Sequence, residues 1–208
     1  MLHTKAIEHG TLSLLKELML VPELNDFALV GGTALALRYG HRSSVDIDLF
    51  NTHRFSLVEL PVCLEKYFGK RFVHKHQQSG IGVFGFIDDI KVDLIHFPIE
   101  RIAALSKVEG IRFYQDPDIA AMKVQAILGR AKKKDFWDMQ ELLKYYSLEQ
   151  IMDWHHQKYP NQMLAISIPH AITYFVDAEE SETPISFKGQ TWAKVKKDIS
   201  KVVREYLS

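Results

Sequence analysis

The sequence has a single cysteine, Cys63, among 208 residues, and this scarcity excludes an intrachain disulfide framework. A chain without disulfides is typical of a reducing compartment, so we expect the cytoplasm. No uninterrupted apolar run reaches the roughly 20 residues that a membrane-spanning helix needs, and the charged N-terminus does not resemble a secretion signal. We therefore expect no membrane partner. The apolar neighbours of Cys63 favour a buried, unreactive thiol over a nucleophile.

A surplus of charge of either sign is also absent, because 26 Lys and Arg balance 26 Asp and Glu. This balance argues against a protein whose whole surface coats nucleic acid. The densest basic cluster is local and consists of Arg130 and Lys132–Lys134. Repeats and low-complexity segments are missing too. The length and a hydrophobic content of 47% suit one large globular domain or two small ones.

The first part of the chain predicts a mixture of helices and strands. Apolar periodicity favours helices near residues 4–20, 33–40 and 56–70, the second ending at Gly40 as a C-cap. Alternating or β-branched runs favour strands near residues 27–32, 44–50, 71–77, 80–87 and 90–97. Asp88-Asp89 separates the last two strands, which indicates a hairpin.

The character of the sequence changes near Asp116. Asp116 is a candidate N-cap, Pro117 suits the first helical position, and an alanine-rich segment follows. A further helix is expected over about 135–146, and the remainder is mostly helical with polar breaks. We therefore predict an α/β core over residues 1–115 and a helical C-terminal region over residues 116–208.

Two aspartates in the run "SVDIDLF" pose a physical problem. Alternate side chains of a strand share a face, so Asp46 and Asp48 would lie together with Cα atoms about 6.5–7 Å apart. Aspartate is disfavoured in strands, and the two carboxylates repel each other. A cation between them would remove both objections, and Mg²⁺ prefers such oxygen ligands. The alternative is a polar, solvent-exposed face.

A third carboxylate, Asp93, lies in another apolar strand, "IKVDLIHF". If this strand lies beside the first, Asp93 joins Asp46 and Asp48. Three carboxylates can hold two Mg²⁺ ions for phosphoryl transfer, and Asp93 would then be the candidate base for an acceptor hydroxyl. Asp88 and Asp89 fit ordinary turn positions instead.

The segment Gly31-Gly32-Thr33 follows a predicted strand and precedes a helix. Glycine allows the backbone to approach a ligand closely, and N–H groups at a helix start favour an anion. Such a pair often makes only a tight turn. Within 15 residues of the acidic pair, it suggests a site for phosphates.

These residues resemble the nucleotidyltransferase superfamily related to DNA polymerase β, and within it the AbiEii/AbiGii-type nucleotidyltransferases, often toxins of toxin–antitoxin or abortive-infection systems. The resemblance rests on "ALVGGTALALRYGHRSSVDIDLF", "IKVDLIHFP", "DIAAMKVQAILGRAKKKDFWDM" and their spacing, over about residues 28–139. It implies a polymerase β-like α/β (α+β) core with a small mixed sheet, flanking helices and a helical C-terminal part. It also implies an enzyme that transfers NMP from an NTP to an acceptor hydroxyl with Mg²⁺ or Mn²⁺, and a cognate antitoxin protein as partner.

The resemblance also implies roles for individual residues. The phosphate turn would be Gly31, Gly32 and Thr33, with Ser44 near a phosphate; the metal ligands and catalytic carboxylates would be Asp46, Asp48 and Asp93; the nucleotide would contact Lys123 and Arg130. Seven residues separate Lys123 from Arg130, so the two share one helix face; an exposed basic face is the alternative.

Charged residues near these motifs each have two possible roles. Asp135, which with Asp138 resembles the last family motif, either orients Lys123 or Arg130 or caps the next helix. The cations Arg38, His41 and Arg42 either steer a phosphate or balance the acidic strand.

Three functions fit the motifs. The leading one is nucleotidyl transfer, with RNA or tRNA as a candidate acceptor beside small molecules and proteins. A DxD glycosyltransferase also places a metal on two aspartates, but it needs neither the glycine turn nor a third carboxylate. A degenerate member that binds nucleotide or a partner without turnover is the third. Ten histidines, His74 and His76 among them, lack the spacing of a structural zinc site and are taken as surface or core residues.

Overall fold

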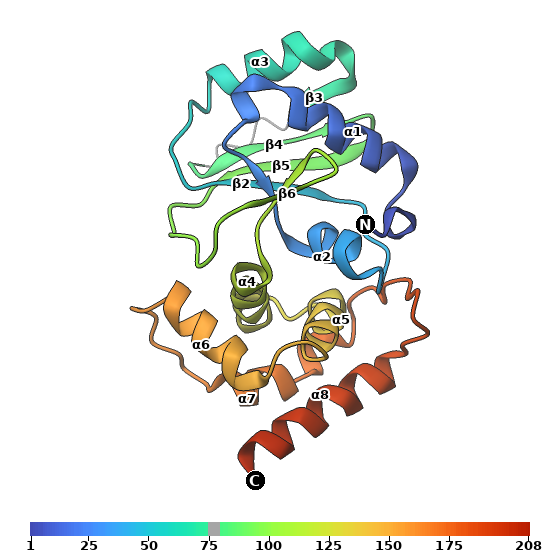
Figure 1. The fold of residues 1–208 in the computed structure, drawn as a ribbon, viewed down its shortest axis with the longest axis vertical. Coiled ribbons are helices and arrows are strands. Elements are labelled where there is room, and N and C mark those ends of the chain that lie inside the picture. The colour runs from blue at the N-terminus through green and yellow to red at the C-terminus, as the bar shows by residue number, and fades with distance from the viewer. Residues whose placement is uncertain (75–79) are drawn as a thin grey trace. The chain divides into compact units, whose positions relative to one another are not determined.

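The computed structural model describes residues 1–74 and 80–208. Two compact units form within it. Unit 1 comprises residues 1–38, 44–100 and 105–114; unit 2 comprises residues 39–43, 101–104 and 115–208. Each unit has its own core, and Figure 1 shows the strands in unit 1 and helices α4 to α8 in unit 2. Within the described ranges, no helix has the length and apolar character needed to cross a membrane.

Unit 1 is built around a mixed sheet, of which Figure 1 labels β2 to β6. Its seven described strands follow the order β3-β4-β5-β2-β1-β7-β6. The strands are β1 (Ala28–Leu29), β2 (Ile47–Asn51), β3 (Phe72–His74), β4 (Gly82–Ile87), β5 (Ile90–His96), β6 (Ser106–Val108) and β7 (Ile111–Phe113). Strand β2 runs parallel to β5 and antiparallel to β1, which places β2 and β5 side by side within the sheet.

The helices of unit 1 are α1 (His9–Leu20), α2 (Gly31–Tyr39, whose last residue belongs to unit 2) and α3 (Glu59–Phe68), with short 3-10 turns at Thr4–Ala6, Pro22–Leu24 and Gly69–Arg71. Helix α1 packs against β7, and α3 packs against β3 and β4. The predicted helix over 4–20 is therefore two elements, because the chain is extended at Ile7 between them. Gly40 has φ +60° directly after α2, so it is the C-cap that the sequence predicts.

Two tight hairpins connect strands of the sheet. Asp88 and Asp89 have φ +51° and +63° between β4 and β5, which is the type I′ pattern and confirms the predicted hairpin. Glu109 and Gly110 make the same pattern between β6 and β7. The sequence analysis missed this second hairpin because each of its strands has only three residues.

Unit 2 consists of α4 (Asp116–Gly129), α5 (Lys133–Leu142), α6 (Leu148–Lys158), α7 (Ile168–Thr173), a 3-10 turn (Val176–Ala178) and α8 (Trp192–Leu207). Its core includes the fully buried Trp137, whose ring stacks on that of the half-buried Trp192 with the centroids 5.8 Å apart. The N-cap of α4 is Gln115, so Pro117 is the second helical residue and the prediction of Asp116 as the cap was wrong by one position. The limits of the two predicted domains remain a prediction.

Candidate active site

An acidic face forms in unit 1 where β2 and β5 lie side by side. We use this name for Asp46, Asp48 and Asp93. The parallel register pairs Asp48 with Asp93, so their side chains leave the same face of the sheet from neighbouring strands. Ile47, Leu49, Val92 and Leu94 alternate with them and are buried on the opposite face. Asp46 lies one residue ahead of β2, because the strand begins at Ile47 rather than at the predicted Ser44.

Asp93 is the most enclosed of the three carboxylates, with 7% of its surface exposed. Its Oδ2 accepts an ion pair from Lys91, while its Oδ1 is buried and makes no hydrogen bond with the described residues. A buried carboxylate oxygen without a donor is costly, and a cation would satisfy it. The described residues contain no group of three His, Cys, Asp or Glu side chains close enough to enclose a metal. A metal at the acidic face would therefore be bound by one or two of the carboxylates and would complete its shell with water and phosphates, as Mg²⁺ does.

Gly31 starts α2 directly against the acidic face. Its φ is +71°, and a Cβ at this position would lie 3.0 Å from Oδ2 of Asp48. A side chain would therefore be strained by the backbone and crowded by the carboxylate. The N–H groups that begin α2, Gly32 among them, lack partners within the helix and favour an anion. The start of α2, whose N–H groups favour an anion, thus lies close to the carboxylate of Asp48.

Thr33 connects the glycine turn to the segment that precedes β2. Its buried hydroxyl donates to the carbonyl oxygen of Asp46 and lies 2.9 Å from the hydroxyl of Ser44. These contacts fix the backbone of Asp46. The Thr33 side chain therefore positions the acidic face, while its backbone belongs to the predicted phosphate turn.

Lys91 was missed by the sequence analysis. It lies on β5 two residues before Asp93 and shares its face, and 41% of its side chain is exposed. Burial acts to lower its pKa, but the hydrogen bond to Asp93 and the charges of Asp93, Asp48 and Asp46 raise it overall. The signal in the sequence was the alternation K-V-D, which puts a lysine and an aspartate on one face of a strand.

Lys123 and Arg130 meet at one carboxylate in unit 2. Nζ of Lys123 lies 2.9 Å from Oδ1 of Asp135, and the Arg130 guanidinium makes two contacts of 3.1 Å with the same carboxylate. Asp135 is the third residue of α5, so the structure shows the ion pairs rather than a cap. Lys123 is buried, whereas 52% of the Arg130 side chain is exposed.

Asp138 is the centre of a buried ionic cluster, by which we mean Asp138, His41, Arg42, Lys123 and Asp135. Arg42 donates from Nε and Nη2 to the two oxygens of Asp138 at 2.7 and 2.8 Å, and Lys123 approaches it to 2.6 Å. Nε2 of His41 lies 2.7 Å from Oδ1. Burial acts to raise the pKa of Asp138, but the charges of Arg42 and Lys123 and these hydrogen bonds hold it well below its usual range.

The three cations Arg38, His41 and Arg42, which follow or end helix α2, contact other residues of the protein. His41 and Arg42 both contact Asp138 within unit 2. Arg38, in unit 1, donates to the carbonyl oxygen of Tyr114 at 2.9 Å and lies over the ring of Phe113. The carboxylate that His41 and Arg42 contact is thus Asp138, and the two roles considered for these cations from the sequence stay predictions.

A family model described as "Nucleotidyl transferase AbiEii toxin, Type IV TA system" matches residues 13–170. The chain belongs to this family. It is 33% identical over 190 residues to an uncharacterized protein of Aquifex aeolicus (strain VF5), a match that covers 88% of this chain and 89% of that protein. As an AbiEii family member it is a nucleotidyltransferase, which confirms the predicted family and enzyme class.

Two solved structures share the fold of this AbiEii family member. JHP933 from Helicobacter pylori has a TM-score of 0.58 and 16% identity, with 96% of this chain and 92% of that chain covered. MenT4, nucleotidyltransferase toxin Rv2826c from Mycobacterium tuberculosis H37Rv, has a TM-score of 0.51 and 12% identity, with 92% and 82% covered. The mixed sheet with flanking helices is therefore the predicted nucleotidyltransferase fold.

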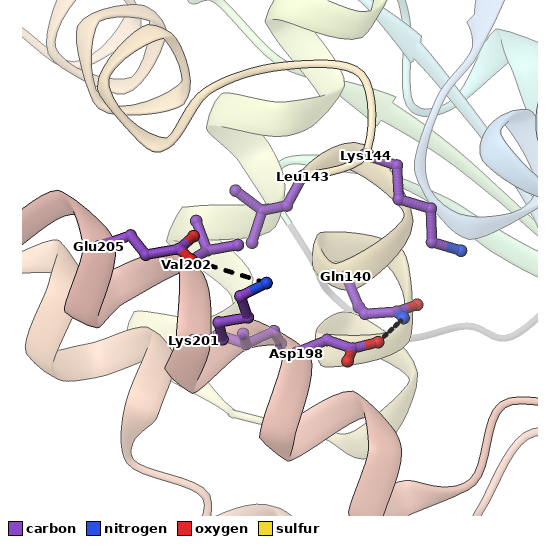
Figure 2. Close-up of a pocket in the computed structure, with 8 residues that line it drawn as sticks. Gln140, Leu143, Lys144, Asp198, Lys201, Val202 and Glu205 are labelled. Carbon is purple, nitrogen blue, oxygen red and sulfur yellow. Dashed lines mark hydrogen bonds and ion pairs between the residues drawn. The ribbon is translucent and has the colours of Figure 1, made fainter.

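A separate surface pocket of this AbiEii protein lies between α5 and α8 (Figure 2). Gln140 bonds Asp198 at 2.8 Å on one side, and Lys201 lies 3.6 Å from Glu205 on the other. Its lining residues are Gln140, Leu143, Lys144, Asp198, Ile199, Lys201, Val202 and Glu205. None of them is a site residue predicted from the sequence.

The structure also tests the predictions for the single cysteine and for two of the histidines. Cys63 on α3 is half-buried rather than buried, so that part of the prediction was wrong. Burial and a hydrogen bond with Glu23 raise the pKa of its thiol to about 11, which fits the expected low reactivity. His74 belongs to no metal-binding group among the described side chains, and His76 lies outside the described residues.

Proposed function

We propose that this AbiEii nucleotidyltransferase transfers NMP from an NTP to a hydroxyl of an RNA, with a divalent metal, Mg²⁺ or Mn²⁺, held by Asp46, Asp48 and Asp93. The observation that supports it most is the contact of two elements: Gly31 at the start of α2 lies against Asp48, which is paired in register with Asp93. A triphosphate on the helix start would thus adjoin the metal ligands.

In the proposed reaction the acceptor hydroxyl oxygen attacks the α-phosphorus. The bond between this phosphorus and the bridging oxygen to the β-phosphate breaks, and pyrophosphate leaves. Asp93 takes the proton of the acceptor hydroxyl, because its Oδ1 is buried and accepts no hydrogen bond from the described residues. Asp46, Asp48 and Asp93 would hold a divalent metal, which would supply positive charge to neutralise the phosphates and orient the reacting oxygens.

The remaining residues have supporting roles in this proposal. The backbone of Gly31 to Thr33 binds phosphate, and Ser44 and Thr33 fix the position of Asp46. The roles implied for Lys123 and Arg130, contact with the nucleotide, remain predictions. Arg130 is the more exposed of the two, and Lys123, with Asp135, belongs to the buried ionic cluster.

Membership of the AbiEii family supports an antitoxin as a cognate partner, and nucleotidyl transfer is favoured over the glycosyl transfer considered from the DxD pair. We also propose that the protein acts in the cytoplasm, where its single cysteine suits the reducing conditions.

The test is label transfer from each α-³²P-labelled NTP to total cellular RNA in the presence of Mg²⁺. We expect labelled RNA with the wild type and none with Asp48→Asn. Asp89→Asn is the matched control, because Asp89 is an exposed turn residue of the same sheet and asparagine tolerates its positive φ. Label in protein or small molecules instead of RNA would show that RNA is not the acceptor. Binding of NTP without transfer of label would favour the non-catalytic alternative.

A further inference from the structure

Lys91 is a fourth charged residue beside the three carboxylates of the acidic face. Asp46 and Asp48 occupy two alternate positions on the chain that enters β2, and Lys91 and Asp93 occupy two alternate positions on β5. The register pairs Asp48 with Asp93 and Ile47 with Val92. Two residues before Asp48 and Asp93 on their chains lie Asp46 and Lys91. Three of the four residues are therefore negative and the fourth is positive.

The ammonium of Lys91 is directed at the carboxylates. Its Nζ is ion-paired to Oδ2 of Asp93, and it interacts electrostatically with Asp48 and Asp46. On the other side of β5, the strand partners of Lys91 and Asp93 are Phe86 and Phe84, which have no charge. The acidic face is thus neutralised in part by a cation of the same chain.

From this geometry we infer that Lys91 is a built-in counter-ion that competes with the divalent metal for Asp93 and moves to the triphosphate when metal and nucleotide bind together. This inference rests on the proposed function, because it concerns the same carboxylates. A metal ion that binds Asp93 must displace the ammonium from Oδ2 or lie close to it, and two cations so near each other repel. Lys91 is 41% exposed, so its long side chain has room to change position.

The consequence is a binding order. Without nucleotide, the other anions near the displaced ammonium are Asp46 and Asp48, which are themselves proposed metal ligands, so metal binds weakly. With nucleotide, the phosphates offer the ammonium a new partner, so metal and triphosphate strengthen each other's binding. Lys91 is therefore a positioning residue that couples the two ligands, and it prevents the carboxylates from holding metal alone.

The experiment measures Mn²⁺ binding to the full chain by electron paramagnetic resonance, without nucleotide and with a non-hydrolysable NTP analogue. We expect Lys91→Met to bind Mn²⁺ alone about tenfold more tightly, the size expected for removing one charge near a divalent ion even at close to aqueous dielectric. The same variant should lose most of the gain in Mn²⁺ affinity that the analogue causes in the wild type. Lys91→Arg should resemble the wild type because it keeps the charge.

Two control variants distinguish a failure of the counter-ion role from a failure of the proposed function. Lys107→Met removes an exposed lysine from β6 of the same sheet and should change neither affinity. Asp93→Asn should abolish the difference that Lys91→Met makes. Equal or weaker Mn²⁺ binding by a folded Lys91→Met variant would overturn the counter-ion role while leaving the proposed function intact. If neither the wild type nor Lys91→Met binds Mn²⁺ with or without the analogue, both the inference and the proposed function are wrong.

Discussion

Removing the charge of Asp138 should destabilise the protein strongly. In Asp138→Asn the shape of the side chain is kept, but Arg42 and Lys123 lose a carboxylate that they contact at 2.6 to 2.8 Å in a fully buried position. Asp135 still pairs with Lys123, whereas Arg42 loses both of its contacts with the carboxylate of Asp138. A buried ion pair that loses one partner costs about 3–5 kcal/mol, because the remaining charge is left uncompensated.

The assay is urea unfolding followed by circular dichroism, with thermal unfolding as a second measurement. For a chain of this length, the expected loss lowers Tm by about 10 °C. Asp153→Asn, an exposed aspartate on α6 in the same unit, is the matched control and should change stability by no more than about 0.5 kcal/mol. If Asp138→Asn lowers the free energy of unfolding by less than about 1 kcal/mol, the Asp138 carboxylate does not compensate the buried charges of Arg42 and Lys123.

The same variant also has a distinct pH dependence. The folded-state pKa of Asp138 is depressed below its unfolded value of about 4, so its stabilising effect is complete above pH 4 and is lost as pH falls toward the folded value. The wild type should therefore lose stability between about pH 4 and pH 2 more steeply than Asp138→Asn. Parallel curves in this range would show that Asp138 titrates normally.

Three further variants test local features. Gly31→Ala should lower stability by about 1–2 kcal/mol, because it forces a side chain into φ +71° and against Asp48; an unchanged urea midpoint would contradict this geometry. Asp89→Gly should raise stability by about 0.5–1 kcal/mol, since glycine suits the second position of a type I′ turn, and a loss on urea unfolding would mean another turn type. Alkylation of Cys63 should be slow at pH 7 and rise about tenfold per pH unit toward pH 11, and Glu23→Gln should accelerate it; a plateau near pH 8.5 would indicate an ordinary thiol.

The strands of the acidic face could be predicted because their sequence signals are local. Alternation in "SVDIDLF" and "IKVDLIHF" identified β2 and β5, and Asp88-Asp89 identified the turn before β5. The sequence predicted that Asp48 and Asp93 lie together only if their two strands are neighbours. The sheet order decides that, and it is a property of the whole unit.

Other parts of the candidate site could not be predicted, because they depend on side-chain contacts between distant segments. The sequence left open whether Asp135 pairs with Lys123 and Arg130 or caps a helix, and only the position of the α5 start decides this. Nothing local in the sequence indicated that Arg42 would bind Asp138, 96 residues further along the chain. Lys91 was not predicted as a site residue, because its alternation with Asp93 shows a shared strand face but not which charged groups from other segments meet there.

The division of the chain into two units has a consequence for protein engineering. The backbone passes between the units at five points, after residues 38, 43, 100, 104 and 114, so neither unit is one continuous stretch. A fragment that starts at residue 115 would keep Asp138 and Lys123 but would lack His41 and Arg42, two of the donors to Asp138. Truncation at that boundary therefore removes part of a core rather than a neighbouring module. Isolating the helical unit would require grafting residues 39–43 and 101–104 back onto it.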